Sequence, residues 1–204
     1  MRLLLASRNE HKRREFERLL GAGEWALDAL PESVTLPPED GATFAENALG
    51  KARAAAAQTG RASIADDSGI AAAVLAGAPG VRSARYAGEH ASDAENLAKL
   101  LREAPAGSAL EYVCALAYVD PAERLERVFA GRCTGRLSAQ PRGERGFGYD
   151  PVFLPDEVPA GAAGRPQPTM AELSDAQKDA ISHRGRAARA LLGWLRRGDG
   201  AAEG

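Results

Sequence analysis

Two short segments of the chain carry side chains that suit phosphate binding and the activation of water. The first is Ser7-Arg8-Asn9-Glu10-His11-Lys12, which follows a short apolar stretch and opens a segment with helical periodicity. The free N–H groups at the start of a helix attract anions, and Ser7, Asn9 and Lys12 add donors for phosphate oxygens. A capped helix with a solvated basic face explains the same residues equally well, so this segment alone leaves phosphate binding open.

The second segment is Asp66-Asp67-Ser68-Gly69, which follows the mostly apolar residues 62–65. These apolar residues predict a short strand, and we expect the acids at its carboxyl end, where the ligand sites of open α/β sheets gather. Two adjacent carboxylates repel one another unless a cation or a role as a base stabilises the arrangement. An ordinary Asp-Ser-Gly turn is the alternative, but delivery of the acids by an apolar strand favours a functional site.

Three further segments hold polar or aromatic groups in less specific patterns. Glu39-Asp40 lies in a loop before a helix that carries Lys51, and acids in a loop are most often simply solvated. Gly146-Phe147-Gly148-Tyr149-Asp150 places two aromatic rings among glycines, which suits stacking on a base but also a loop packed on the core. Lys178 and Ser182-His183-Arg184 bring donors together, a pattern that the capped start of a basic helix also produces.

The elements that position these groups are predicted from periodicity and from cap and turn signals. Thr43 and Glu46 form a capping-box pattern at the start of a helix that ends at Gly60. Early alternation of strands and helices, followed by a long hairpin, indicates an α/β fold with a mixed sheet in residues 1–197, with a disordered tail over 198–204. Other helices are expected over 9–20, from 92 onwards and over 184–197, strands over 2–7, 25–30, 62–65, 112–119, 125–133 and 151–154, and loops over 31–42, 77–91 and 156–168.

Composition limits the class of protein. The chain has 204 residues, of which 45% are hydrophobic and 26% charged, so a sizeable packed α/β domain is expected. The formal net charge of -2 disfavours the binding of long nucleic acid, which usually needs a basic excess. No apolar run reaches the roughly 18 residues that predict a membrane span, and the first residues do not resemble a secretion signal. We expect Cys114 and Cys133 as reduced thiols in or near the core of a cytoplasmic protein.

Taken in order, these segments resemble one family, the inosine/xanthosine triphosphate pyrophosphatases (ITPases), from Leu3 to about Leu192. The chain departs from the family pattern between Asp156 and Thr169, where it is longer than expected, so the geometry of that loop is not predicted. The matching strings are Ser7-x-Asn9-x-x-Lys12-x-x-Glu15, Gly41-x-Thr43-Phe44-x-Glu46-Asn47-Ala48-x-x-Lys51-Ala52, Asp66-Asp67-Ser68-Gly69, Gly77-x-Pro79-Gly80-Val81-x-Ser83-x-Arg85-Tyr86, Gly146-x-Gly148-Tyr149-Asp150-Pro151 and Ser182-His183-Arg184.

The resemblance implies a fold and an activity. The fold is an elongated mixed sheet with flanking helices, divided into two lobes around a central nucleotide-binding cleft, and the protein is expected to be a homodimer. The activity is hydrolysis of ITP, dITP and XTP to the nucleoside monophosphate and pyrophosphate, which cleanses the nucleotide pool. Mg²⁺ is expected on Asp67 and on Glu39 or its neighbour Asp40, and Asp67 is also expected to be the general base.

The resemblance also assigns residues to the two ends of the substrate. The triphosphate is expected to bind Lys51 and the first segment, Ser7, Arg8, Asn9, Glu10, His11 and Lys12, with Ser68 as a further substrate contact. The base is expected to be surrounded by Phe147, Gly148, Tyr149, Asp150, Lys178, His183 and Arg184.

The implied reaction suits these residue types. Water attacks the α-phosphorus, and Mg²⁺ and lysines neutralise the charge that builds on pyrophosphate. Donors from His183 and Arg184 match the 6-keto group of hypoxanthine and xanthine and disfavour the 6-amino group of adenine. Two alternatives stay open, a related pyrophosphatase with another base preference, such as modified pyrimidines, and a catalytically silent nucleotide-binding protein. Asp67 speaks against the second, because binding alone gains nothing from a carboxylate beside phosphates.

Overall fold

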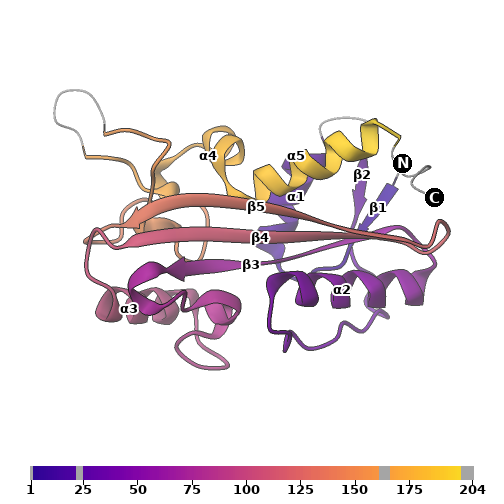
Figure 1. Cartoon of the computed structure of the whole chain (residues 1–204), viewed down its shortest axis with the longest axis horizontal. Helices are drawn as coiled ribbons and strands as arrows, with labels where there is room; N and C mark the ends of the chain where they lie inside the picture. Colours follow the sequence, from indigo (N-terminus) through magenta and orange to yellow (C-terminus); the bar gives the residue numbers. More distant parts are fainter. Residues whose placement is uncertain (1, 22–24, 161–165, 199–204) are drawn as a thin grey trace. The chain divides into compact units, whose positions relative to one another are not determined.

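The protein is a mixed α/β fold, as the sequence predicts. The computed structural model describes residues 2–21, 25–160 and 166–198. Six strands form one sheet in the order β2-β1-β3-β4-β5-β6, in which β1 pairs in parallel with β2 and β3 while β5 and β6 are antiparallel (Figure 1). The strands are β1 Arg2–Leu5, β2 Ala26–Asp28, β3 Ser63–Ala72, β4 Ala109–Asp120, β5 Leu125–Leu137 and β6 Phe153–Pro155.

The first three α-helices begin where side-chain caps satisfy their first N–H groups. Asn9 caps α1, while Thr43 with Glu46 and Ser92 with Glu95 form the capping boxes of α2 and α3. The helices are α1 Glu10–Leu20, α2 Phe44–Thr59, α3 Asp93–Glu103, α4 Asp175–Ile181 and α5 His183–Arg196. Short 3₁₀ turns are η1 Ala73–Leu75, η2 Gly80–Arg85, η3 Asp150–Val152 and η5 Met170–Glu172, so part of the predicted loop 77–91 is helical.

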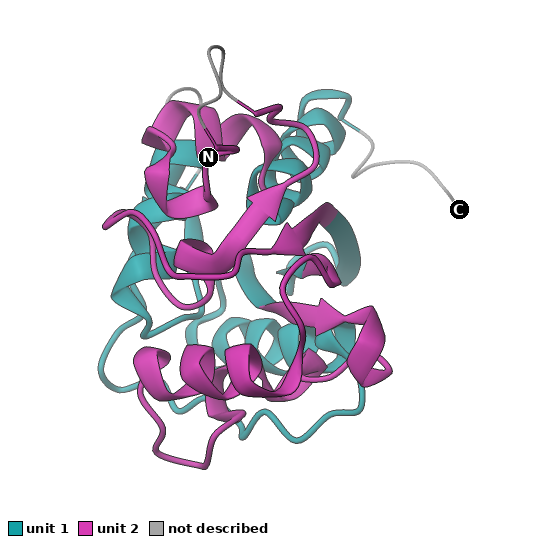
Figure 2. Ribbon diagram, turned by 90° about the vertical axis from the view of Figure 1, so that its left-hand side faces the viewer, with its two compact units in different colours: residues 1–67, 114–131, 183–204 teal, residues 68–113, 132–182 magenta. Residues whose placement is uncertain are grey.

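The chain divides into two compact units, coloured separately in Figure 2. Unit 1 comprises residues 1–67, 114–131 and 183–204, and unit 2 comprises residues 68–113 and 132–182. Strands β3, β4 and β5 each contribute residues to both units. The two units are the compact parts in which the polar clusters below are found.

Unit 1 has a core on each face of its strands, because successive side chains of a strand point to opposite sides. Leu3 and Leu5 of β1 share one core with Phe16 of α1. Leu4 of β1 belongs to the other, which includes Ala48 of α2. The helix α5 packs on the same core as α1, through Ala187, Ala188, Leu191 and Trp194. The core of unit 2 gathers around Phe153, whose ring centroid lies 4.5 Å from that of Tyr112.

The structure corrects one prediction that concerns the site. The residues Asp66-Asp67-Ser68-Gly69 do not lie at the carboxyl end of their strand, because β3 continues to Ala72. Parallel pairing with β1 ends at Leu5 and Ile64, so it is β1 that stops beside these acids. The apolar residues Ile70 and Ala72 are buried in the core of unit 2, which explains why the chain stays extended after Gly69.

Several other expectations have clear outcomes. Cys114 and Cys133 are buried and are not joined in a disulfide, as predicted. No helix among residues 2–21, 25–160 and 166–198 has the length and apolar character that crossing a membrane requires. Of the predicted loop 156–168 and the predicted tail 198–204, residues 161–165 and 199–204 lie outside the described residues. The helix α4 was not predicted, although Ser174 and Gln177 form a capping box at its start.

Candidate active site

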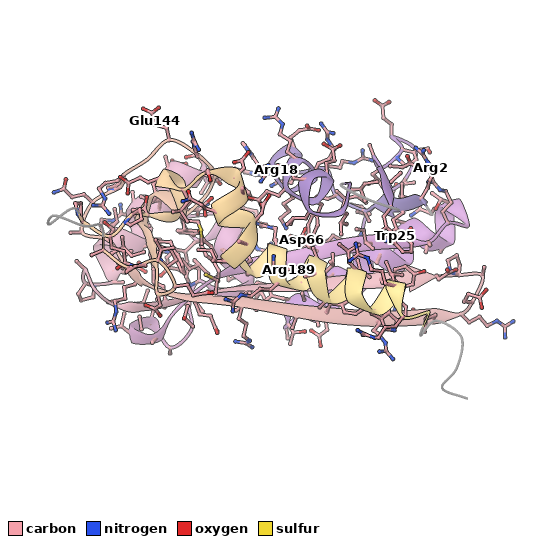
Figure 3. All side chains as sticks on the ribbon, turned by 90° about the horizontal axis from the view of Figure 1, so that it is seen from above. Arg2, Arg18, Trp25, Asp66, Glu144 and Arg189 are labelled. Carbon is pink, nitrogen blue, oxygen red and sulfur yellow. The ribbon has the colours of Figure 1, made fainter. Side chains whose placement is uncertain are left out.

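The adjacent acids of β3 lie in different surroundings within unit 1. Asp66, labelled in Figure 3, is fully buried, and its Oδ2 lies 3.0 Å from Lys12 Nζ and 3.3 Å from Arg184 Nε. Arg184 also donates from Nη1 to Glu15 Oε2 at 3.0 Å. Lys12 and Glu15 come from α1 and Arg184 from α5, so the first and last helices both place a cation on the carboxylate of β3.

The cations decide the charge state of Asp66. Burial by itself would raise the pKa of this carboxyl, but the charges of Lys12, Arg184 and Lys51 outweigh burial and hold the pKa well below its usual value. Asp66 is therefore ionised throughout the neutral range. Its position suits a fixed negative charge that holds Lys12, and a group with so low a pKa is a poor proton acceptor.

The helix α2 supplies the contacts of Asp67 and the second lysine. Asn47 Nδ2 donates to Asp67 Oδ2 at 2.8 Å, and Asn47 Oδ1 accepts from the backbone N–H of Gly41 at 2.8 Å. Four residues later, on the same face of the helix, Lys51 Nζ donates to the backbone oxygen of Asp66 at 2.7 Å and forms an ion pair with Glu39. One face of α2 thus contacts both acids of β3 and the acid of the preceding loop.

The pKa of Asp67 shifts in the direction opposite to that of Asp66. Burial raises the pKa of the Asp67 carboxyl and the charge of Glu39 adds to the rise, while Lys51, the hydrogen bond from Asn47 and Lys12 only partly oppose it. Burial alone would lower the pKa of Lys51, but Asp66, Glu39 and Asp67 together raise it. The cluster therefore combines a charged lysine with a carboxylate that is a stronger base than an ordinary aspartate.

The first segment has a mixed role. Asn9 caps α1 by accepting from Lys12 N at 3.1 Å, and Ser7 Oγ accepts from Asn9 N at 3.2 Å. Arg8 is turned toward the loop after β2, where Nη2 donates to Val34 O at 2.9 Å and also contacts the carbonyl oxygens of Pro31 and Glu32. Glu10 pairs with Arg13. The charge of Lys12, by contrast, acts on both acids of β3.

Unit 2 contains a second buried ion pair, at the segment 146–150 that carries Phe147 and Tyr149 and is called the aromatic loop below. Lys178 Nζ lies 2.6 Å from Asp150 Oδ2, and both side chains are buried. Asp150 also accepts from Tyr112 Oη at 3.1 Å and from the backbone N–H of Phe147 at 2.9 Å. Lys178 Nζ lies 5.3 Å from the centroid of the Phe147 ring. The loop predicted to contact a base is thus held against a lysine and an acid in the same unit.

Comparison with known proteins places the chain in a family. A model of the Ham1 family matches residues 3–194. This chain belongs to that family. The dITP/XTP pyrophosphatase of Mycolicibacterium paratuberculosis is 50% identical over 199 residues, which cover 93% of each chain. The protein of the same name from Frankia alni is 48% identical over 207 residues, covering 96% of this chain and 98% of that one.

A solved structure supports the same assignment. The HAM1 protein from Coxiella burnetii has a TM-score of 0.83 at 38% identity, covering 97% of this chain and 99% of that one. The resemblance drawn from the sequence strings and the predicted mixed α/β fold are both confirmed. The roles of individual residues are not tested by these matches and remain predictions.

The donor set of this Ham1-family chain fits Mg²⁺. Glu39 and Asp67 offer carboxylate oxygens whose charges both act on Lys51, and the charge of Glu39 also acts on Asp67. In the part of the chain that the structure describes, no three His, Cys, Asp or Glu side chains gather to hold a metal ion by themselves. Mg²⁺ commonly binds one or two carboxylates and takes its other ligands from water and substrate phosphates. Asp40, the alternative ligand, is exposed.

The remaining predicted residues divide between the units. His183 and Arg184 are buried at the start of α5 in unit 1, whereas Phe147, Tyr149 and Lys178 belong to unit 2. Their common role around a base stays a prediction. Sequence reasoning gave no role to Asn47 or Glu15, although both occur in the family strings, because neither is informative until its partner across the fold is known.

Proposed function

We propose that this chain hydrolyses non-standard purine nucleoside triphosphates, namely ITP, dITP and XTP, to the monophosphate and pyrophosphate. The observation that supports this most is the cluster of Lys12, Lys51, Glu39 and Asp67 around β3 in unit 1. It combines phosphate-binding cations with a basic carboxylate, in a chain 50% identical to a protein named dITP/XTP pyrophosphatase. We further propose that the protein acts in the cytoplasm as a homodimer.

The proposed reaction assigns one task to each charged group. Asp67 orients a water molecule and accepts its proton as the water oxygen bonds to the α-phosphorus, and the bond from that phosphorus to the bridging oxygen breaks. Pyrophosphate leaves with its charge neutralised by Lys12 and Lys51. Asp66 keeps Lys12 in place and stays ionised. Glu39 and Asp67 would hold Mg²⁺, which supplies charge neutralisation on the phosphate oxygens when bound.

The base contacts follow from the sequence assignment. Phe147 and Tyr149 provide aromatic surface, and Lys178 provides a donor fixed by Asp150. His183 and Arg184 are the proposed donors to the 6-keto group. Arg184 already donates to Asp66 and Glu15, so in this proposal the guanidinium binds these two carboxylates and the base together.

The test is pyrophosphate release from a panel of triphosphates, with and without Mg²⁺. We expect ITP, dITP and XTP to be preferred over ATP by one or more decades in kcat/KM, because mismatched buried donors cost about 1–3 kcal/mol each. Removal of Mg²⁺ with a chelator should abolish release. Preference for a modified pyrimidine would establish the first alternative, and binding without release would establish a silent nucleotide-binding protein.

The phosphate assignment is tested on α2 with a matched pair of variants. Lys51→Ala is expected to lower kcat/KM for ITP by roughly one to two decades, since a charged donor to phosphate is worth about 1.5–3 kcal/mol. Arg53→Ala is the control, because Arg53 lies on the same helix but pairs with Glu126 at the surface, where ion pairs contribute little. Unchanged kcat/KM in the Lys51 variant at sub-saturating ITP would rule out the assignment.

A further inference from the structure

The aromatic loop of unit 2 has a conformation that its sequence does not fix alone. Gly146 and Gly148 have φ angles of 73° and 62°, in the left-handed region that favours glycine. A Cβ on Gly146 would lie 2.0 Å from Asp150 Oδ2, so the absence of a side chain also makes room for that carboxylate. Glycines leave an unanchored loop many alternative conformations. The position of Phe147 and Tyr149 therefore depends on contacts from outside the loop.

Two of these contacts are buried at the carboxyl side of the loop. Asp150 is held by Tyr112 and Lys178, as described above. Tyr149 Oη donates to the backbone oxygen of Ser83 at 2.8 Å. Burial, Tyr86 and Asp93 raise the pKa of Tyr149, so its hydroxyl keeps the proton that it donates.

The third contact reaches the middle of the loop from α3. The backbone N–H of Gly148 donates to Asp93 Oδ2 at 2.9 Å. Asp93 is the first residue of α3, but the capping box of that helix is made by Ser92 and Glu95. The Asp93 carboxylate thus accepts a hydrogen bond from the loop, between the two aromatic residues.

We propose that Asp93 is a positioning residue that sets the affinity for the base by fixing Gly148, and with it the rings of Phe147 and Tyr149. The inference rests on the proposed function, since it assumes that these rings contact the substrate. Gly148 lies between the two aromatic residues, so its bond to Asp93 constrains the backbone that carries both rings. Asp93 is exposed, and its replacement leaves the buried core of unit 2 intact.

The experiment compares three variants with the wild type. Asp93→Ala removes the acceptor, Asp93→Asn retains a side-chain oxygen that accepts from Gly148, and Ser92→Ala weakens α3 at its cap without touching the loop. The readouts are kcat and KM for ITP and the inhibition constant of inorganic tripolyphosphate, which carries phosphates but no base. Thermal melting reports the stability of each variant.

Asp93→Ala is expected to raise KM for ITP by about three- to tenfold with kcat changed by less than about twofold, as for loss of a uniform binding contact. Asp93→Asn should stay close to the wild type, and Ser92→Ala should lower the melting temperature without raising KM. The inhibition constant of tripolyphosphate should not change in any variant.

Three results would overturn the inference. They are an unchanged KM in Asp93→Ala, an equal rise of KM in Ser92→Ala, or an equal weakening of tripolyphosphate binding. Failure of the proposed function has a different signature, because the folded wild type would then release no pyrophosphate from any purine triphosphate. In that case the dissociation constants of ITP for wild type and Asp93→Ala, measured by calorimetry, are compared instead of KM. A wild type that does not bind ITP contradicts both proposals.

Discussion

Asp67→Asn is expected to lower kcat for ITP by about 10²–10⁴-fold, the usual worth of a general base, and to raise the melting temperature of the free protein. Burial raises the pKa of Asp67, so the folded protein binds this proton more tightly than the unfolded chain does. The contribution of the Asp67 carboxyl to the free energy of unfolding therefore falls as the pH rises through its pKa. At neutral pH the ionised carboxylate destabilises the folded protein. Asparagine removes the charge and keeps an oxygen for the hydrogen bond from Asn47.

Steady-state kinetics with Mg²⁺ and thermal melting without added metal, both at neutral pH, test these two effects. Asp156→Asn is a suitable control, since that carboxylate is exposed and lies 3.9 Å from Arg136. Activity within about tenfold of the wild type would exclude Asp67 as the general base. A lower melting temperature would contradict the assignment of its charge as an energetic cost.

The neighbouring variant, Asp66→Asn, is expected to have the opposite effect on stability. Its carboxylate is fully buried between Lys12 and Arg184, and removing one partner of a buried ion pair costs roughly 3–5 kcal/mol. The pKa of Asp66 is lowered in the folded protein, so its stabilisation is complete above the ordinary aspartate value of about 3.9 and is lost as the pH falls further.

Urea unfolding of wild type and Asp66→Asn at neutral pH and at successively lower pH measures this contribution. The difference in the free energy of unfolding should be largest at neutral pH and should shrink once the pH falls below the unfolded-state pKa of aspartate. A difference that does not depend on pH would show that the variant acts through packing and not through charge. Equal effects of the Asp66 and Asp67 variants would contradict the distinct roles proposed here.

The parts of the fold that were predicted correctly depend on neighbouring residues in the sequence. The start of α2 follows from Thr43 and Glu46, three residues apart, which exchange hydrogen bonds within one turn. The start of α1 at Asn9 is local in the same way. The seven residues of α4 were missed because a helix of two turns has too few apolar positions to show periodicity, and only its capping box indicates it.

The parts that were not predicted depend on residues far apart in the sequence. Asp66 was expected at the end of a strand, because the two acids and Gly69 resemble a turn, while the continuation of β3 is decided by burial of Ile70 in unit 2. The partner of Glu15 is Arg184, 169 positions away, and no local pattern connects them. The types of the site residues were therefore visible in the sequence, but the network that sets their charges was not.

The division of unit 1 into three stretches of chain has a consequence for synthesis on the ribosome. All residues of unit 2 precede position 183, whereas unit 1 requires residues 183 onwards, including α5. A growing chain therefore has every residue of unit 2 available before Arg184 can reach Asp66 and Glu15. Until then Asp66 lacks its ion pair with Arg184, so its charge is fully compensated only after α5 has been synthesised.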